Sequence, residues 1–155
     1  MGRLALAASL VAALPAIAAV ESYTIDPNHT FPSFEIGHFG YSLQRGRFNK
    51  TAGSVKLDPA ARTGTVDVAI DVASIDTGHE KLENDLRSDN FLDAAKYPTI
   101  TFERTGLLFD GDQIKSVTGD LTMKGRSRPV TLIDRFVPAV SDEMALRINV
   151  EAMKD

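Results

Sequence analysis

The 155-residue sequence contains no cysteine and no tryptophan, and it has only three histidines. Without cysteine the chain can form no disulfide bond, so an exported domain of this composition must be held together by its hydrophobic core alone. The sequence also lacks the G-x-S-x-G pattern of an activated serine and the H-E-x-x-H pattern of a zinc protease. His79 and Glu83 are four residues apart, but they stand in HEKLE. We therefore expect no catalytic residues, no metal site and no enzymatic activity.

An excess of basic residues is also missing. The chain has 17 Lys and Arg against 21 Asp and Glu, and its formal net charge is −4. Binding to nucleic acid or attraction to an anionic membrane surface requires a clustered basic face. The composition therefore predicts no nucleic-acid partner and argues against attraction to an anionic membrane surface.

Long apolar runs are absent except at the start of the chain. Residues 1–19, MGRLALAASLVAALPAIAA, combine one cation at Arg3, an apolar run, a break at Pro15 and small residues near the end. This is the layout of a secretory signal peptide, and the run is shorter than the roughly 20 residues that span a bilayer. We expect 1–19 to be a signal peptide and 20–155 to form one domain.

Strict alternation of apolar and polar residues is the main signal in the rest of the chain. From residue 65 to 74, Val66, Val68, Ile70 and Val72 share one face, and acidic or small residues occupy the other. Such a segment is typical of an antiparallel sheet with one wet face. The same pattern recurs at Phe34–Ile36, Val55–Leu57, Ile100–Phe102, Val117–Met123, Val130–Leu132 and Leu146–Val150. The sequence thus predicts about seven or eight strands.

Short turns rich in Gly, Pro and Asp separate these strands, which favours an up-and-down arrangement. About eight such strands avoid exposed edges most simply by closing into a barrel, although a β-sandwich would show the same alternation. One charged excursion from Ser74 to Phe102 interrupts the pattern, and Leu82 and Leu86 within it share one face of a short helix. We predict an all-β, antiparallel, eight-stranded barrel with a helical cap. Its interior is either packed with side chains or holds one small ligand.

Several ordered blocks carry a resemblance to a known family. They are YTIDPNHTFPSFEIGHFGYSLQRGRFNKTAGSVKLD, VDVAIDVASIDTG, LRSDNFLDAAKYPTITF and SVTGDLTMKGRSRPVTL. From about Tyr23 to Leu132 the chain closely resembles the YceI-like family of bacterial periplasmic proteins. The resemblance implies a lipocalin-like barrel whose apolar cavity holds a long isoprenoid chain, such as a respiratory quinone tail or a polyprenyl lipid. The chain departs from the family at Asp85, where a histidine is common, and it lacks the usual Ser-Asp-Phe-Gly ending.

Strand parity and the match to the family motifs together indicate the ligand-binding residues. They are Phe34, Ile36, His38, Phe48, Leu86, Arg87, Phe91, Tyr97 and Phe102. Phe91 and Phe102 are candidates for cavity lining, or for ordinary core. Tyr97 precedes a proline at a strand start and is expected at the barrel rim.

The two most polar candidates each have two interpretations. His38 shares strand parity with Phe34 and would point into the barrel, either toward a ligand head group or as a hydrogen-bonded core histidine. Arg87 could donate to a head-group oxygen, or it could lock the helix to a loop carboxylate. The carboxylates nearest to it in sequence belong to Asp76, Asp85 and Asp89.

The function that we predict is non-catalytic binding, transport or sequestration of an isoprenoid lipid of quinone or polyprenyl type in the periplasm. No cofactor is required. The expected partners are the lipid itself and a membrane quinone-handling protein, and the protein is expected to be a monomer or homodimer. Two alternatives stay open. One is a quinone-linked redox accessory or enzyme that uses His38, and the other is a ligand-free stress-response or adhesion module with a packed barrel.

Overall fold

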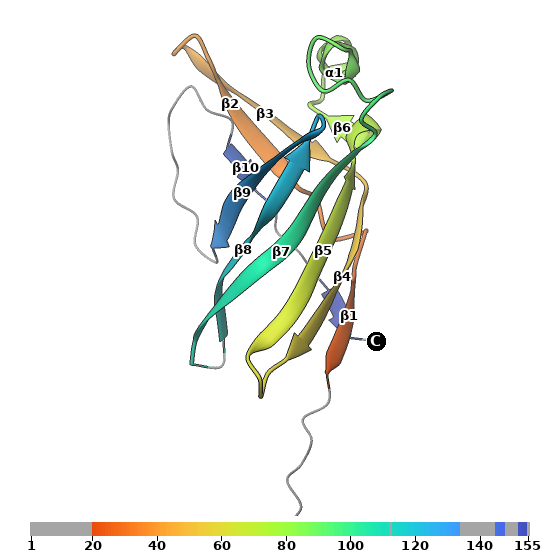
Figure 1. The fold of residues 1–155 in the computed structure, drawn as a ribbon. Helices are drawn as coiled ribbons and strands as arrows, with labels where there is room; N and C mark the ends of the chain where they lie inside the picture. Colours follow the sequence, from red (N-terminus) through yellow and green to blue (C-terminus); the bar gives the residue numbers. More distant parts are fainter. Residues whose placement is uncertain (1–19, 112, 134–144, 148–151, 155) are drawn as a thin grey trace, which may run out of the picture.

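The computed structural model describes residues 20–111, 113–133, 145–147 and 152–154, so the expected signal peptide lies outside the described residues (Figure 1). The described chain forms eleven strands, one 3-10 turn and one α-helix. Their bounds are β1 Glu21–Ile25, β2 Ser33–His38, β3 Ser42–Phe48, β4 Thr51–Asp58, β5 Thr63–Asp71, η1 Val72–Ser74, β6 Ile75–Asp76, α1 Glu80–Arg87, β7 Thr99–Asp110, β8 Gln113–Met123, β9 Arg126–Ile133, β10 Ala145–Arg147 and β11 Ala152–Lys154. Eight of these strands have five residues or more, and β6, β10 and β11 are shorter.

The strands form two sheets, and every pairing within the described residues is antiparallel. The larger sheet has the order β11-β1-β4-β5-β7-β8-β9, and the smaller one β10-β2-β3-β6. The helical excursion separates β5 from β7 along the chain, yet these two strands pair directly. The last two strands belong to different sheets. β10 pairs with β2 in the smaller sheet, and β11 pairs with β1 in the larger one. The prediction of an all-β antiparallel fold with one helical excursion is confirmed.

Both sheets contribute to one hydrophobic core. Val68 of β5 lies opposite Phe102 of β7, which in turn lies opposite Leu121 of β8. Phe34 and Phe48 add aromatic rings from the smaller sheet. Each large apolar side chain that is fully removed from water contributes about 1.5–3 kcal/mol to stability. The apolar residues of the alternating pattern thus point inward, into a core that both sheets enclose.

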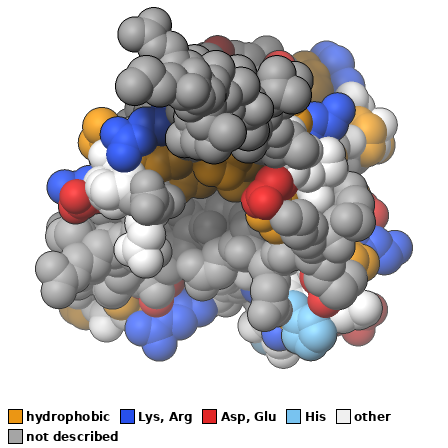
Figure 2. All heavy atoms as spheres, turned by 90° about the horizontal axis from the view of Figure 1, so that it is seen from below, with side chains coloured by type: hydrophobic (Ala, Val, Ile, Leu, Met, Phe, Trp, Pro, Cys, Tyr) orange, Lys and Arg blue, Asp and Glu red, His pale blue; other side chains and the backbone are white. Residues whose placement is uncertain are grey.

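The two ends of the molecule differ. Figure 1 shows α1, β6, the β8–β9 turn and the tip of the β2–β3 hairpin at one end, and the β4–β5 and β7–β8 turns at the other. Figure 2 views the molecule from the end opposite α1, where charged side chains of both signs lie at the periphery with hydrophobic side chains between them. In the described part of the chain, no helix has the length and apolarity needed to cross a membrane.

Candidate functional site

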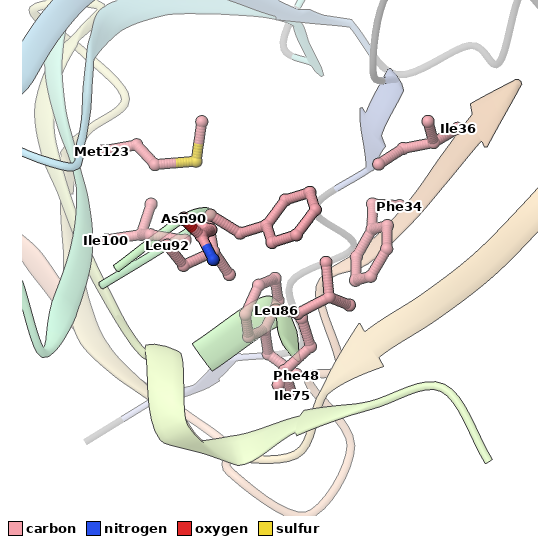
Figure 3. Close-up of a pocket in the computed structure, with 10 residues that line it drawn as sticks. Phe34, Ile36, Phe48, Ile75, Leu86, Asn90, Leu92, Ile100 and Met123 are labelled. Carbon is pink, nitrogen blue, oxygen red and sulfur yellow. The ribbon is translucent and has the colours of Figure 1, made fainter. Parts of the chain in front are cut away.

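A cavity of about 280 Å³ lies beneath α1 and the segment that follows it. Its lining residues are Phe34, Ile36, Phe48, Ile75, Leu86, Asn90, Phe91, Leu92, Ile100 and Met123. Figure 3 shows how these side chains converge from the smaller sheet, from the helical excursion and from β7 and β8. Nine of the ten are apolar and only Asn90 is polar, so the cavity fits an apolar guest.

The wall formed by the smaller sheet depends on two aromatic rings and a glycine. The ring centroids of Phe34 and Phe48 are 5.8 Å apart in a tilted arrangement. Gly46 lies directly opposite Phe34 in the β2–β3 register. A β-carbon at position 46 would overlap the Phe34 ring, so the absence of a side chain there lets the ring lie across β3.

Helix α1 is fixed at its N-terminus by His79 and Glu83. The Nδ1 atom of His79 accepts a hydrogen bond from the Leu82 N–H at 3.1 Å, which caps the helix. A Glu83 carboxylate oxygen accepts from the Thr77 N–H at 2.9 Å. This hydrogen bond is the main cause that lowers the pKa of Glu83. His79 and Glu83 therefore both stabilise the start of the helix. Among the described residues, no group of side chains is suited to hold a metal ion.

Arg87 ties the other end of α1 to η1 and β6. Its Nε donates to the carbonyl oxygen of Ala73 at 3.0 Å, and its Nη2 donates to that of Ile75 at 3.0 Å. Further bonds reach Asn84 at 3.1 Å and Glu83 at 3.4 Å on the same helix. Arg87 thus positions the neighbouring Leu86 over the cavity. Its carboxylate partner is Glu83, and none of the three aspartates expected from sequence takes this place.

Residues 88–93, the cover segment, close the cavity on the side of the helix. The Leu92 N–H donates to the Leu86 carbonyl oxygen at 3.0 Å, which folds the segment back on α1. From the β8–β9 turn, the Lys124 ammonium donates to the carbonyl oxygens of Asp89 at 2.8 Å and Phe91 at 2.6 Å. The cover segment is therefore held by both α1 and the β8–β9 turn, while Phe91, which also lines the cavity, stays 54% exposed.

The structure brings together five of the nine residues predicted from sequence to bind a ligand. Those that line the cavity are Phe34, Ile36, Phe48, Leu86 and Phe91. Arg87 anchors the helix, as described above. Phe102 is fully buried in the core, and the Tyr97 ring lies beside Gly125 of the β8–β9 turn. Contact of any of these residues with a ligand stays a prediction.

The expectation that His38 points into the barrel is wrong. His38 is exposed, and its ring meets that of Phe39 edge-on with centroids 4.6 Å apart. The reason is the length of the hairpin. Among the described residues, β10 pairs with β2 only from Ser33 to Glu35, so His38 lies beyond the part of β2 that has a strand on both sides.

Sequence reasoning missed half of the cavity lining, namely Ile75, Asn90, Leu92, Ile100 and Met123. Ile100 and Met123 belong to alternating patterns that were visible in the sequence. Parity gives the face on which a residue lies, but it does not say which end of a strand meets the cavity. Asn90 lies outside the alternating segments and is not among the residues that match a family motif, so no sequence pattern indicated that it lines the cavity.

Comparisons with known proteins place the chain. The YceI-like domain model matches residues 23–152. A UPF0312 protein of Vibrio cholerae is 35% identical over 142 residues, which cover 90% of this chain and 75% of the relative. The crystal structure of Burkholderia cenocepacia BcnA has a TM-score of 0.61 and 31% identity, covering 69% of this chain and 67% of that one.

A polyisoprenoid binding domain from Saccharophagus degradans, implicated in plant cell wall breakdown, has a TM-score of 0.57 and 18% identity. The match covers 70% of this chain and 63% of that chain. These neighbours confirm the lipocalin-like barrel fold, and the pairings described above confirm that its strands are antiparallel. The match to the domain model spans most of the sequence and agrees with the blocks read from it, so the chain belongs to the YceI-like family.

Proposed function

We propose that the protein binds the hydrocarbon chain of an isoprenoid lipid in the cavity beneath α1. The observation that carries the proposal is the lining, in which nine apolar side chains surround a single amide. Membership of the YceI-like family and the fold shared with a polyisoprenoid binding domain support it. Family and fold alone do not assign a ligand, whereas the apolar lining of this site selects an apolar one.

Burial of the chain supplies the binding energy. Each methylene removed from water contributes about 0.8 kcal/mol, so a five-carbon isoprene unit contributes about 4 kcal/mol before the cost of ordering the chain. The cavity of about 280 Å³ is near the lower end of the range of ligand pockets, which is about 300–1,000 Å³. A site of this size accommodates the terminal units of a long prenyl chain. The Asn90 amide is the one polar side chain in the lining and offers hydrogen bonds to a guest.

We further propose that residues 1–19 direct export, and that the protein acts in the periplasm as a non-catalytic carrier of a quinone or polyprenyl lipid. The position of His38 outside the cavity lining favours a carrier over a redox accessory that works through this imidazole. The cavity itself favours a carrier over a packed module. Loading and delivery would involve a membrane protein that handles the same lipid.

Solvent extraction of protein purified without detergent, followed by mass spectrometry, tests this function. We expect wild-type protein from the periplasm of a bacterial host to release a prenyl lipid. Met123→Trp, which places a large side chain in the cavity, should release little or none. Leu108→Trp is the matched control, because Leu108 is exposed near the far end of β7. The proposal fails if wild-type protein carries no prenyl lipid and takes up neither added quinone nor polyprenol.

A further inference from the structure

The β2–β3 hairpin projects from the cavity end of the molecule. Its strands pair with each other from Ser33–Arg47 out to His38–Ser42. Within the described residues, β6 pairs with β3 only at Arg47 and Phe48, and β10 reaches β2 only at its first three residues. Residues 36–44, the hairpin tip, therefore form a two-stranded ribbon that extends past the parts of β6 and β10 that the structure describes (Figure 1).

The hairpin tip exposes large apolar side chains. Phe39 is 82% exposed and Tyr41 is 93% exposed, and Leu43 is also exposed. The tip sequence, IGHFGYSLQ, contains no Asp, Glu, Lys or Arg, although these residues make up 25% of the chain. An uncharged cluster of exposed aromatic side chains adds nothing to the core and is typical of an interaction surface.

The turn at the end of the hairpin has a backbone conformation that is unfavourable for Phe39. Phe39 and Gly40 have φ angles of 50° and 72°, and the Tyr41 N–H donates to the His38 carbonyl oxygen at 3.0 Å. Two consecutive positive φ angles define a type I′ turn, which prefers Asn, Asp or Gly at its first central position. A bulky aromatic residue is strained there, and such strain is found at functional positions. Phe39 is thus placed at the apex against the preference of the turn.

We propose that the hairpin tip inserts into the interfacial region of a lipid bilayer. Amphipathic aromatic side chains are enriched where membrane meets water. Ile36 belongs both to the tip and to the cavity lining (Figure 3), and the half-exposed Phe91 lines the same cavity. Insertion of the tip brings the cavity mouth to the acyl boundary that a lipid chain must cross. The use of this docking for lipid exchange rests on the proposed function.

Insertion of this kind depends on apolar contact and not on charge. The cations next to the tip are paired, since Arg45 Nε lies 2.8 Å from a Glu35 oxygen and Arg47 Nε lies 3.7 Å from an Asp76 oxygen. Binding should therefore change little with ionic strength, unlike that of a protein attracted by a basic patch.

Because the chain has no tryptophan, one introduced indole reports its own surroundings. Tyr41→Trp is mixed with vesicles of three parts phosphatidylethanolamine to one part phosphatidylglycerol. We expect a blue-shifted emission that brominated acyl chains quench, at low and at high salt. Leu108→Trp, at the opposite end, should show neither effect. The inference is overturned if Tyr41→Trp emission stays unshifted, or if it shifts without vesicles as protein concentration rises, which would assign the tip to self-association.

A second variant separates docking from lipid binding. Phe39→Asn suits the turn and removes the ring, so it should melt no lower than wild type and partition into vesicles about tenfold more weakly. Uptake of a prenyl alcohol added from ethanol should be unchanged, while transfer from vesicles slows to the same degree as partition. Partition of Phe39→Asn into vesicles as strong as that of wild type would refute docking by the tip, and transfer at the wild-type rate despite weaker partition would refute the use of this docking for lipid exchange. If wild-type protein takes up no prenyl alcohol added from ethanol, the proposed function is refuted instead.

Discussion

Replacement of Arg87 by methionine distinguishes a structural arginine from a ligand-binding one. The variant keeps an apolar stem of similar length but loses the hydrogen bonds to the carbonyl oxygens of Ala73 and Ile75, both at 3.0 Å. A hydrogen bond from a charged donor contributes about 1.5–3 kcal/mol, and the side chain is 30% exposed, which places the bonds near the lower end. We expect Arg87→Met to lower the free energy of unfolding by about 2 to 3 kcal/mol.

Urea denaturation of lipid-free protein measures this loss, and Arg45→Met is the control. Arg45 also forms an ion pair, with Glu35 at 2.8 Å, but its side chain is 71% exposed. Exposed pairs contribute about 0–1 kcal/mol, so this variant should be nearly as stable as wild type. If both variants lose the same small amount of stability while Arg87→Met alone loses lipid affinity, Arg87 binds the ligand and its assignment as a helix anchor is refuted.

Three further predictions concern the cavity and its cover. Lys124→Asn removes the two hydrogen bonds to the cover segment and should speed lipid release to acceptor vesicles several-fold. Asparagine suits the positive φ of 49° at this position, so the turn itself should be kept. Lys124→Arg should release lipid as slowly as wild type. Phe102→Ala should lower the free energy of unfolding, measured by urea denaturation, by about 3–5 kcal/mol, because Phe102 is fully buried. Phe91→Ala should lower it by less than about 1 kcal/mol, because Phe91 is half exposed, but should weaken prenyl binding. Equal losses of stability in the two variants would contradict this assignment. Because the folded-state pKa of Glu83 is lowered, its contribution to stability is present at neutral pH and is lost as pH falls below the ordinary value of 4.5, so Glu83→Gln should flatten the acid limb of the stability profile. An acid limb as steep as that of wild type would exclude Glu83 as a contributor.

The fold was predictable because the signals that specify it are local. Alternation at Val66, Val68 and Ile70 reports one buried face regardless of what that face meets. The spacing of Leu82 and Leu86 reported the helix in the same way. The pairing of β5 with β7 across the excursion, and of β1 with β4, depends on distant parts of the chain, which alternation does not identify.

The site was predictable only in part, because parity does not reveal where a sheet ends. Phe34 and His38 share a face of β2, yet one lines the cavity and the other lies on the exposed hairpin. Arg87 shows a second limit. Its acceptors are the backbone carbonyl oxygens of Ala73 and Ile75. Every residue has a carbonyl oxygen, so a sequence indicates only carboxylate side chains as specific partners. The aromatic hairpin tip was equally hidden, since apolar residues in a strand are expected to face inward.

Calorimetric titration of lipid-free protein with a prenyl alcohol tests the central claim most directly, namely that the cavity beneath α1 is the lipid site. The wild type and Leu108→Trp should show saturable one-site binding with a negative heat-capacity change, because apolar surface is buried. Met123→Trp should unfold at the same urea concentration as wild type or higher, yet bind no prenyl alcohol. Binding by Met123→Trp with the affinity and heat-capacity change of the wild type would show that the lipid is held elsewhere.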